Sequence, residues 1–332
     1  MNESSVISVM NEHKLHWLAL EAARMKRMAE RWSQLEDRVE GLLASLVQEM
    51  VQRQANGEPM RQADLLALRR YQLLLTQLEA ERQTYRLYAI GEIESGQREF
   101  AGLAVQQAGE ALTAVNEHLP TPKPPVGAIE DRVGETADGT PLTDVVLTAA
   151  VWAAILDALT RNTLQEVAAG RPQPSVLRTI KDTLAKGLEQ AISITRMEQG
   201  YIHREFTRRV YQASQVVAGY YRLAKKDNRT CMACLADDGT FYPIDQPMPE
   251  HPKGRCSQVP AVIGFTKPQW QTGGDWFETL AESTQRDMMG NGRYQAWRDG
   301  QFNLRDLAVV RQSAGHPDSL APAPLKELLA GG

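Results

Sequence analysis

The chain has 332 residues, and its composition of 42% hydrophobic and 23% charged residues is that of a folded globular protein, which excludes wholesale disorder. It carries 37 Lys and Arg residues against 41 Asp and Glu residues, and the formal net charge of -4 excludes a strongly basic nucleic-acid-binding protein. Its 3 cysteines are too few for a disulfide-stapled secreted fold and indicate a reducing compartment.

These features indicate a soluble, intracellular protein of two domains, at roughly 150 residues per domain. The N-terminus has no apolar core segment, so no signal peptide is expected. The most apolar stretch, 145–156, is shorter than the roughly 18 residues that cross a bilayer. We therefore expect no membrane partner.

Residues 1–118 are predicted to form a long α-helical hairpin. Between Lys14 and Met50 apolar residues recur at alternating steps of three and four, close to the repeat of a coiled coil. A turn is expected at 54–59, after which the helical pattern resumes to about His118. The apolar stripe of the first helix contains Leu15, Leu18, Ala22, Met25, Ala29, Trp32, Leu35, Val39, Leu42 and Leu46.

This stripe has two interpretations. It is the internal seam of the hairpin, or part of it docks on a larger partner. The second has a physical reason, because two or three helices alone bury little apolar surface.

Residues 119–143 are rich in proline and glycine, which cannot sustain a helix, and we interpret them as a linker. Residues 144–330 are predicted to form a second domain with a helix to about Ala168 and a further helical block to about Tyr221. Within it, 227–260 has short β-prone pieces between prolines and glycines. The expected fold class is mainly α with a small β/loop-rich module, an α+β protein.

All three cysteines lie in this module in the order Cys231-x2-Cys234, and then Cys256 after His251. A C-x2-C pair in a tight turn joined by a second pair of donors about 20 residues later suits tetrahedral Zn²⁺. A segment with little hydrophobic core is also one that a structural metal stabilises. The four residues are therefore candidate zinc ligands.

Three other interpretations of the cysteines remain open. In the first, the cysteines are small buried hydrophobic residues and His251 is hydrogen-bonded to the backbone. In the second, Cys231 and Cys234 form a C-x2-C redox pair, although no βαβ pattern surrounds this pair. The third is a Cys/His nucleophile pair oriented by Asp237 or Asp238, a thiol enzyme. Catalytic partners usually come from distant segments, and no phosphate-binding, hydrolase or zinc-protease motif occurs, so no enzyme is expected.

A basic run precedes the module, with tyrosines interleaved, and is a candidate nucleic-acid contact through phosphates and stacking. The alternative is a solvated helix face with its tyrosines against the core. The candidate residues are Arg204, Arg208, Arg209, Arg222, Lys225, Lys226 and Arg229.

The string Asp227-Asn228-Arg229-Thr230-Cys231-Met232-Ala233-Cys234, followed by Asp238-Gly239 and then His251-Pro252-Lys253-Gly254-Arg255-Cys256, resembles the core of the phage Mu F-like minor head proteins, also called head morphogenesis proteins. That family typically shows D-x-R-T-C-x-x-C, D-G and H-P-x-C-R-C. This chain departs from it at Gly254, where the family has a cysteine. The resemblance does not extend to residues 1–120, for which the interpretation rests on the residues alone.

Weaker flanking elements occur in the family's order. Upstream, 195–198 is similar to its R-T-E-like helix motif, and downstream 276–304 is similar to its W…Q…G-x-x-R…G…L tail. The resemblance covers roughly 145–328, a little over half the chain.

The resemblance implies a non-enzymatic structural protein of a tailed phage or prophage head, located in the virion at the portal vertex and assembled in the host bacterial cytoplasm. Its implied partners are the portal protein, the major capsid protein and packaged DNA, and its implied role is in capsid assembly and in DNA packaging or ejection. The alternatives from the residues are a zinc-stabilised DNA-binding module and a Cys/His thiol enzyme.

Overall fold

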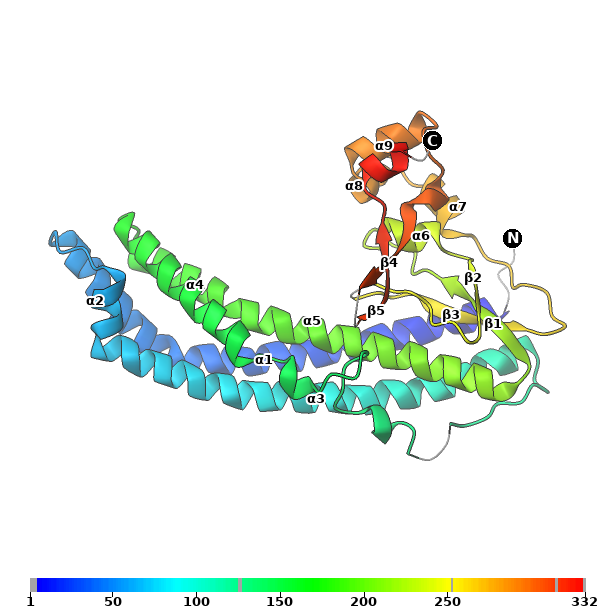
Figure 1. The fold of residues 1–332 in the computed structure, drawn as a ribbon, viewed down its shortest axis with the longest axis horizontal. Helices are drawn as coiled ribbons and strands as arrows, with labels where there is room; N and C mark the ends of the chain where they lie inside the picture. Colours follow the sequence, from blue (N-terminus) through cyan, green and yellow to red (C-terminus); the bar gives the residue numbers. More distant parts are fainter. Residues whose placement is uncertain (1–4, 125–126, 252, 314–315, 331–332) are drawn as a thin grey trace. The chain divides into compact units, whose positions relative to one another are not determined.

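A computed structural model describes residues 5–124, 127–251, 253–313 and 316–330, and it is mainly helical with two small antiparallel sheets (Figure 1). The predicted fold class and the long N-terminal helical hairpin are confirmed. The long helices are α1 (Ser5–Ala55), α3 (Arg69–Val115), α4 (Ala149–Ala168) and α5 (Gln173–Ser214). The short helices are α2 (Gln62–Ala67), α6 (Met232–Ala236), α7 (Gly273–Glu278), α8 (Glu282–Met289), α9 (Asn291–Arg298) and α10 (Leu325–Ala330), with 3-10 turns at Glu130–Arg132, Leu142–Asp144 and Leu304–Leu307.

Five strands make the two sheets. In the three-stranded sheet, β1 (Val217–Leu223) lies between β2 (Phe241–Pro243) and β3 (Ser257–Val262), both antiparallel to it. Tyr220 is the register partner of Tyr242 on one side and of Pro260 on the other. The second sheet is the hairpin of β4 (Ala308–Ser313) and β5 (His316–Pro322).

The chain divides into two compact units that do not follow the consecutive ranges 1–118, 119–143 and 144–330. Unit 1 contains 1–19, 96–139 and 196–332, and unit 2 contains 20–95 and 140–195. The physical reason is the length of α1, α3 and α5, because each of these helices contributes one part to unit 1 and the other to unit 2. Domains defined as consecutive residue ranges therefore do not match the two units, because the unit boundaries fall within these helices.

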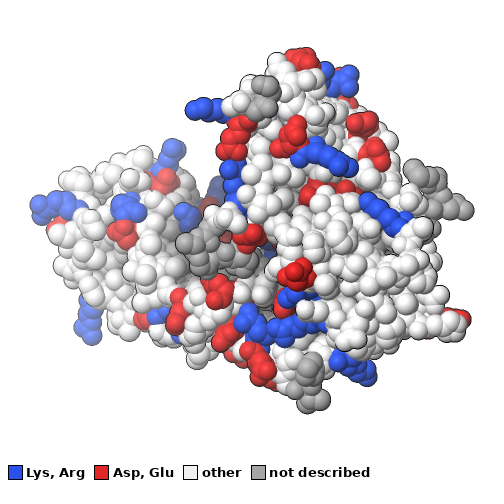
Figure 2. Space-filling model, turned by 45° about the vertical axis from the view of Figure 1, so that its right-hand side comes forward, with Lys and Arg blue, Asp and Glu red and all other residues white. Residues whose placement is uncertain are grey.

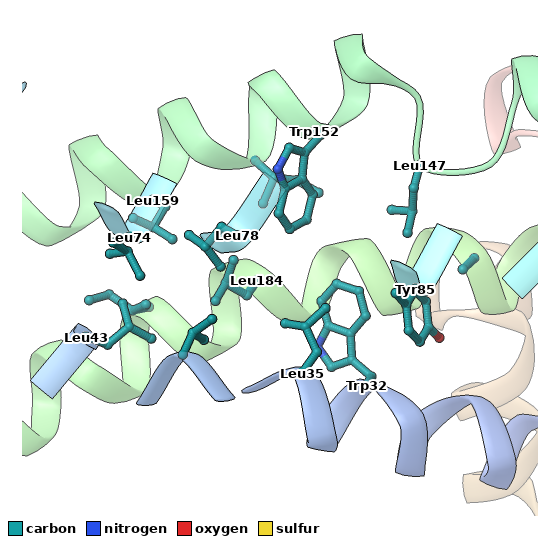
Figure 3. Packing of buried hydrophobic residues seen from close by; sticks show 14 of the residues in the cluster. Trp32, Leu35, Leu43, Leu74, Leu78, Tyr85, Leu147, Trp152, Leu159 and Leu184 are labelled. Carbon is teal, nitrogen blue, oxygen red and sulfur yellow. The ribbon is translucent and has the colours of Figure 1, made fainter. Parts of the chain in front are cut away.

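Unit 2 is a helical bundle whose core explains the apolar stripe of the first helix. Figure 3 shows Trp32 and Leu35 of α1 packed with Tyr85 of α3, Trp152 of α4 and Leu184 of α5. The ring centroids of Trp32 and Tyr85 lie 4.7 Å apart, edge to face. The stripe is therefore covered by the chain's own helices.

This packing corrects the interpretation of the stripe as a docking surface over the part of α1 that lies in unit 2. Met25, Trp32, Leu35, Val39 and Leu46 are all buried there. The sequence argument treated the hairpin as two or three helices, whereas α4 and α5 add the partners that it lacked. Leu15, in unit 1, has 59% of its surface exposed, and Ala22 of the stripe is exposed as well.

The segment Leu142–Ala168 is long and apolar enough to cross a membrane, with a mean hydropathy of 1.8, which the expectation from 145–156 missed. A core helix of a soluble protein passes the same test. In this structure Trp152, Ile155 and Leu159 point into the core of unit 2, and 33% of the apolar window is buried, so packing accounts for part of the apolar character of α4.

Unit 1 holds the predicted cysteine module. Its main core contains Tyr220 of β1, Cys234 of α6 and Phe277 of α7, and a smaller cluster joins Ile7 of α1 to Leu223 and Val259 of the sheet. The buried Lys14 of α1 donates a hydrogen bond to the Leu223 carbonyl at 3.0 Å. The start of α1 thus packs on the strands that flank the cysteines. Pro252, one of the motif residues, lies outside the described residues.

Candidate metal centre

The loop before the first two cysteines is organised by Asp227. Its Oδ1 accepts hydrogen bonds from the Arg229 backbone N–H and the Thr230 hydroxyl, both at 3.0 Å, which is an Asx-type turn. Cys231 then occupies the N-cap position of the short helix α6, and α6 carries Cys234. The D-x-R-T-C part of the motif is therefore a turn that presents one cysteine and starts the helix that presents the next.

Asp227 also reaches the second half of the motif. Its carboxylate accepts two hydrogen bonds from the Arg255 guanidinium, at 2.6 and 2.7 Å. The Arg255 guanidinium lowers the pKa of Asp227 to about 2. Because Cys256 is the next residue and leads directly into β3, this ion pair joins the two cysteine-bearing segments.

Asp238, of the D-G pair, ties the other side of the module together. It accepts hydrogen bonds from the Ala224 backbone N–H at 2.7 Å and from the Trp270 indole N–H at 3.2 Å. Gly239 follows with a φ of 86°, a conformation that strongly favours glycine, and its N–H bonds the Arg222 carbonyl. Asp238 is thus a structural residue and not the orienting group of a Cys/His pair.

The four predicted ligands are brought together. Possible ligand atoms of Cys231, Cys234 and His251 all lie within 4.8 Å of one another, and so do those of Cys234, Glu250 and Cys256. The two groups share Cys234. Within the described part of the chain, a cavity of about 30 Å³ is lined by all three cysteines and His251.

Glu250 is a potential ligand that the sequence argument missed. Its side chain is 6% exposed, against 27% for His251. Its only signal in the sequence is its position next to His251, and that signal is weak because surface carboxylates are common. Its burial is a result of the tertiary fold.

The protonation of the thiols fits a site that takes up a cation. A hydrogen bond with Cys234 lowers the pKa of Cys231 to about 4, and a bond with the same group lowers the pKa of Cys256. The pKa of Cys234 is raised, because its hydrogen-bonding contacts with the thiols of Cys231 and Cys256 and its burial favour the protonated form. Metal binding would replace this shared proton.

The donor set agrees with a metal that prefers sulfur and nitrogen ligands. Bonds of about 2.3 Å from a tetrahedral zinc place two sulfurs about 3.8 Å apart. The donor atoms of each group lie within 4.8 Å of one another, an upper bound that admits this separation. The cluster could therefore hold a metal ion after small side-chain movements.

Gly254, the one departure from the motif pattern, has a geometric explanation. A Cβ atom built at Gly254 would overlap the carboxyl group of Glu250. Gly254 leaves the space that the Glu250 side chain occupies. A side chain at position 254 would displace the Glu250 carboxyl group.

Arg222 was predicted to contact nucleic acid, and this prediction is wrong. Its side chain is 0% exposed, and it donates to Asp237 Oδ2 at 2.6 Å, to Glu250 Oε2 at 3.3 Å and to the Pro249 carbonyl. Burial opposes its charge, but Cys256 and Glu250 keep its pKa well above the ordinary value. A guanidinium enclosed in this way cannot reach a phosphate.

Most of the other basic candidates are also engaged within the protein. Arg208 and Arg209 both pair with Glu205, at 3.0 and 2.9 Å. Lys226 pairs with Asp238 at 3.3 Å, and Arg204 donates to the Gly254 carbonyl at 3.4 Å.

Lys225 and Arg229 line the cavity beside the cysteines. On the face drawn in Figure 2, basic and acidic side chains are intermingled, so that face offers no large basic patch.

Comparison of the chain with protein-family models, with curated proteins and with solved structures found no match.

Proposed function

We propose that the chain is a non-enzymatic minor head protein of a tailed phage or prophage, which docks at the portal vertex and assists capsid assembly and DNA packaging or ejection. In this proposal it is a virion component assembled in the host bacterial cytoplasm. Its partners are the portal protein, the major capsid protein and, locally, packaged DNA.

The observation that carries the proposal is the convergence of the motif residues. Asp227 and Arg255 are separated by 28 positions and form a two-point ion pair, while the cysteines beside them lie around one cavity. Asp227, Thr230, the D-G pair and Arg255 thus have structural tasks in the module that carries the cysteines. This pattern supports the family resemblance, because the residues that carry it lie together in one module and are not scattered over the fold.

Zn²⁺ is the metal that we propose for this module, in a structural role. Three thiolates, an imidazole and a nearby carboxylate are donors that suit zinc, and the loops around them have few helices or strands of their own. Metal analysis of protein purified without chelators should give about one zinc per chain, and Cys234→Ser should abolish it. Metal-free protein in both preparations would contradict the zinc proposal.

The docking surface must differ from the buried stripe of α1. Leu66, Leu73 and Leu87 of α2 and α3 are exposed by 42%, 51% and 67%. These side chains are large apolar groups that the hairpin exposes in unit 2. They support docking by the outer face of the arm.

The proposal is tested by co-expression of the tagged chain with the portal and capsid proteins of the same phage or prophage. We expect it to sediment with portal rings and procapsids. Leu73→Glu with Leu87→Glu should release it, whereas Thr84→Glu, on an exposed position of the same helix, should not. A chain that never sediments with these assemblies would overturn the proposal.

The alternative of a free DNA-binding module is less well supported, because Arg222 is enclosed and Arg208 and Arg209 pair with Glu205. It would require tight DNA binding that weakens steeply with salt.

A further inference from the structure

A larger cavity than the one beside the cysteines lies in unit 1, between α5 and the loop that leads from β2 to β3. Its volume is about 430 Å³, within the range of roughly 300–1,000 Å³ that is typical of ligand sites. Met197 and Tyr201 of α5 and Pro247, Met248 and Pro249 of the loop give it an apolar lining. Met197 is 41% exposed, so the cavity is accessible from solvent.

The loop wall of this cavity is held in place by other parts of unit 1. The Glu250 backbone N–H bonds the Asp318 carbonyl of β5 at 3.3 Å, and the Arg222 guanidinium binds the Pro249 carbonyl. The prolines of the loop also restrict its backbone. A ligand would therefore meet a largely preformed wall and lose little free energy in ordering it.

Arg204 and Gln258 lie at the inner end of the cavity. Both residues also line a smaller cavity of about 20 Å³, which the buried side chains of Lys14 and Trp17 help to enclose. Residues that are shared by two cavities lie between them. Arg204 and Gln258 are therefore the polar groups that a ligand meets where the larger cavity approaches the interior.

Arg204 is a cation without an acidic partner. Among the described residues its hydrogen bond is to the Gly254 carbonyl, at a long 3.4 Å, and no carboxylate pairs with it. Burial lowers the pKa of Arg204, and the charges of Glu250 and Cys256 offset this only in part. The guanidinium is still charged at neutral pH, because arginine does not lose its proton in proteins. An anionic ligand group would therefore supply a partner that the described side chains do not.

Two acidic residues of the lining are already matched by cations. Glu205 pairs with Arg208 at 3.0 Å and with Arg209 at 2.9 Å, and Glu250 pairs with Arg222 at 3.3 Å. These pairs leave neither carboxylate as an unmatched charge that would repel an anion.

The other charged residues of the lining also permit an anion. Burial raises the pKa of Glu198 to about 7, so its carboxyl group is mostly uncharged at a slightly acidic pH. Asp318 is exposed, and solvent and salt screen its charge. Arg196 and Lys253 add positive charge to the same lining. The charges around the cavity therefore favour a negative ligand group at Arg204.

Gln258 adds a requirement for a hydrogen-bond donor. Its side chain is 3% exposed, and its Oε1 accepts no hydrogen bond from the described residues. A buried amide oxygen without a donor is unfavourable, and a ligand N–H would satisfy it. A free fatty carboxylate has no N–H. The last residue of a peptide carries an N–H, a carboxylate and a side chain together.

We propose that this cavity captures the carboxyl-terminal residue of a partner protein chain. Arg204 binds the terminal carboxylate, Gln258 accepts the N–H of the last residue, and the apolar side chain of that residue packs against Met248. Capture of a chain end through its carboxylate is one of the recurring modes of peptide recognition. The inference depends neither on the proposed metal nor on the proposed role in a phage head.

The test measures the fluorescence anisotropy of dye-labelled peptides with the full chain at a slightly acidic pH. The probes are pentapeptides of serine and glycine that end in leucine, phenylalanine, lysine or aspartate. We expect the peptides with leucine and phenylalanine ends to bind best, and a C-terminal amide to weaken them about ten-fold or more, since it removes the charge that faces Arg204. No saturable binding up to about 1 mM peptide, or equal binding of the carboxylate and amide forms, would overturn the inference.

Variants assign the two polar contacts. Arg204→Met should abolish the preference for the carboxylate over the amide, and Gln258→Leu should weaken both forms. Arg286→Met, which removes an arginine paired with Glu282 away from the cavity, should leave binding unchanged. A folded Arg204→Met variant that keeps the carboxylate preference would overturn the assignment of the site to this cavity.

Met197→Glu tests the cavity at an exposed position, in case a substitution of Arg204 prevents folding. The added negative charge should weaken the carboxylate peptides more than their amides, and equal effects on both would contradict the inference. Octanoate is the probe for a free carboxylate with an apolar tail. If octanoate binds more tightly than every peptide, the site takes a free carboxylate and the proposal of a chain end is overturned.

Discussion

The carboxylate of Asp227 and the guanidinium of Arg255 form a two-point ion pair, with N–O distances of 2.6 and 2.7 Å. Asp227 begins the turn that leads to Cys231, and Arg255 directly precedes Cys256. The pair therefore sets the spacing of the two cysteine-bearing segments before any metal is present. Such bidentate pairs combine geometric specificity with strength.

The first prediction concerns the pH dependence of this pair. The pKa of Asp227 is about 2 in the folded protein, below its ordinary value of 3.8. A depressed pKa contributes stability that is present above the unfolded value and is lost as the pH falls toward 2. In metal-free protein, Asp227→Asn should cost about 1 kcal/mol at pH 6, discounted for partial exposure, and clearly less at pH 2, where the Asp227 carboxyl group of the folded protein is about half protonated.

Urea unfolding of both proteins at a series of pH values measures this difference. Asp131→Asn provides a control carboxylate in a 3-10 turn of the same unit. A cost for Asp227→Asn that is the same at pH 2 and pH 6 would contradict the ion-pair explanation.

A second pH effect of opposite sign is expected from Glu198. Burial raises its pKa from 4.5 to about 7, against a hydrogen bond from the Ala137 backbone. The folded state then binds a proton more tightly than the unfolded state, so stability falls as the pH rises from about 4.5 to about 7. Glu198→Gln should remove this slope and stabilise the protein at pH 8, by up to about 3 kcal/mol.

Chemical unfolding at pH 5 and pH 8 tests this prediction. The decisive quantity is the change in unfolding free energy between the two values in each protein. An equal change in Glu198→Gln and the unaltered chain would mean that Glu198 is ionised without penalty.

Gly187 of α5 should tolerate no side chain. A Cβ atom at Gly187 would lie 2.7 Å from Cη2 of Trp32, whose ring is buried in the core of unit 2. Gly187→Ala should therefore overpack the core and cost about 1–3 kcal/mol. Gly41 of α1 has no atom within 4 Å of such a Cβ, and Gly41→Ala should instead stabilise by about 0.5–1 kcal/mol.

Thermal or urea unfolding of the two variants gives both numbers. They share the same chemical change in a helix, so the opposite signs isolate the contact with Trp32. Two stabilised variants would show that Trp32 moves aside freely.

Removal of the proposed metal should loosen unit 1 selectively. The segment 224–262 has short strands and one short helix around the cysteines, whereas the core of unit 2 comes from long helices. A chelator should lower the unfolding temperature by more than about 5 °C, since 1 kcal/mol corresponds to about 2–4 °C for a domain of this size. Hydrogen exchange should rise in β1 and β3 and remain unchanged in α4.

Cys234→Ser without chelator should reproduce this exchange pattern, because Cys234 belongs to both groups of ligands. Increased exchange in α4 to the same extent would mean that the metal supports the whole chain and not the module.

The sequence alone was sufficient to predict the long helices, the loop-rich module and the meeting of Cys231, Cys234, His251 and Cys256, but not the strands β4 and β5. Helical periodicity is a local property, and a C-x2-C pair constrains two ligands within one turn. The tertiary structure was needed for everything that depends on long-range contacts.

The periodicity of α1 marks which face is apolar but not what covers it, and α4 and α5 cover it at Trp32. The sequence does not distinguish Arg222 from an arginine on the surface. In the folded chain it is buried and paired with Asp237 and Glu250. The sequence around Glu250 does not indicate that its carboxyl group lies beside the cysteines. That position is available because Gly254 has no side chain to occupy it. The burial of a side chain and the pairing of its charge depend on contacts with segments that are distant in the sequence. Both are therefore determined only by the tertiary structure.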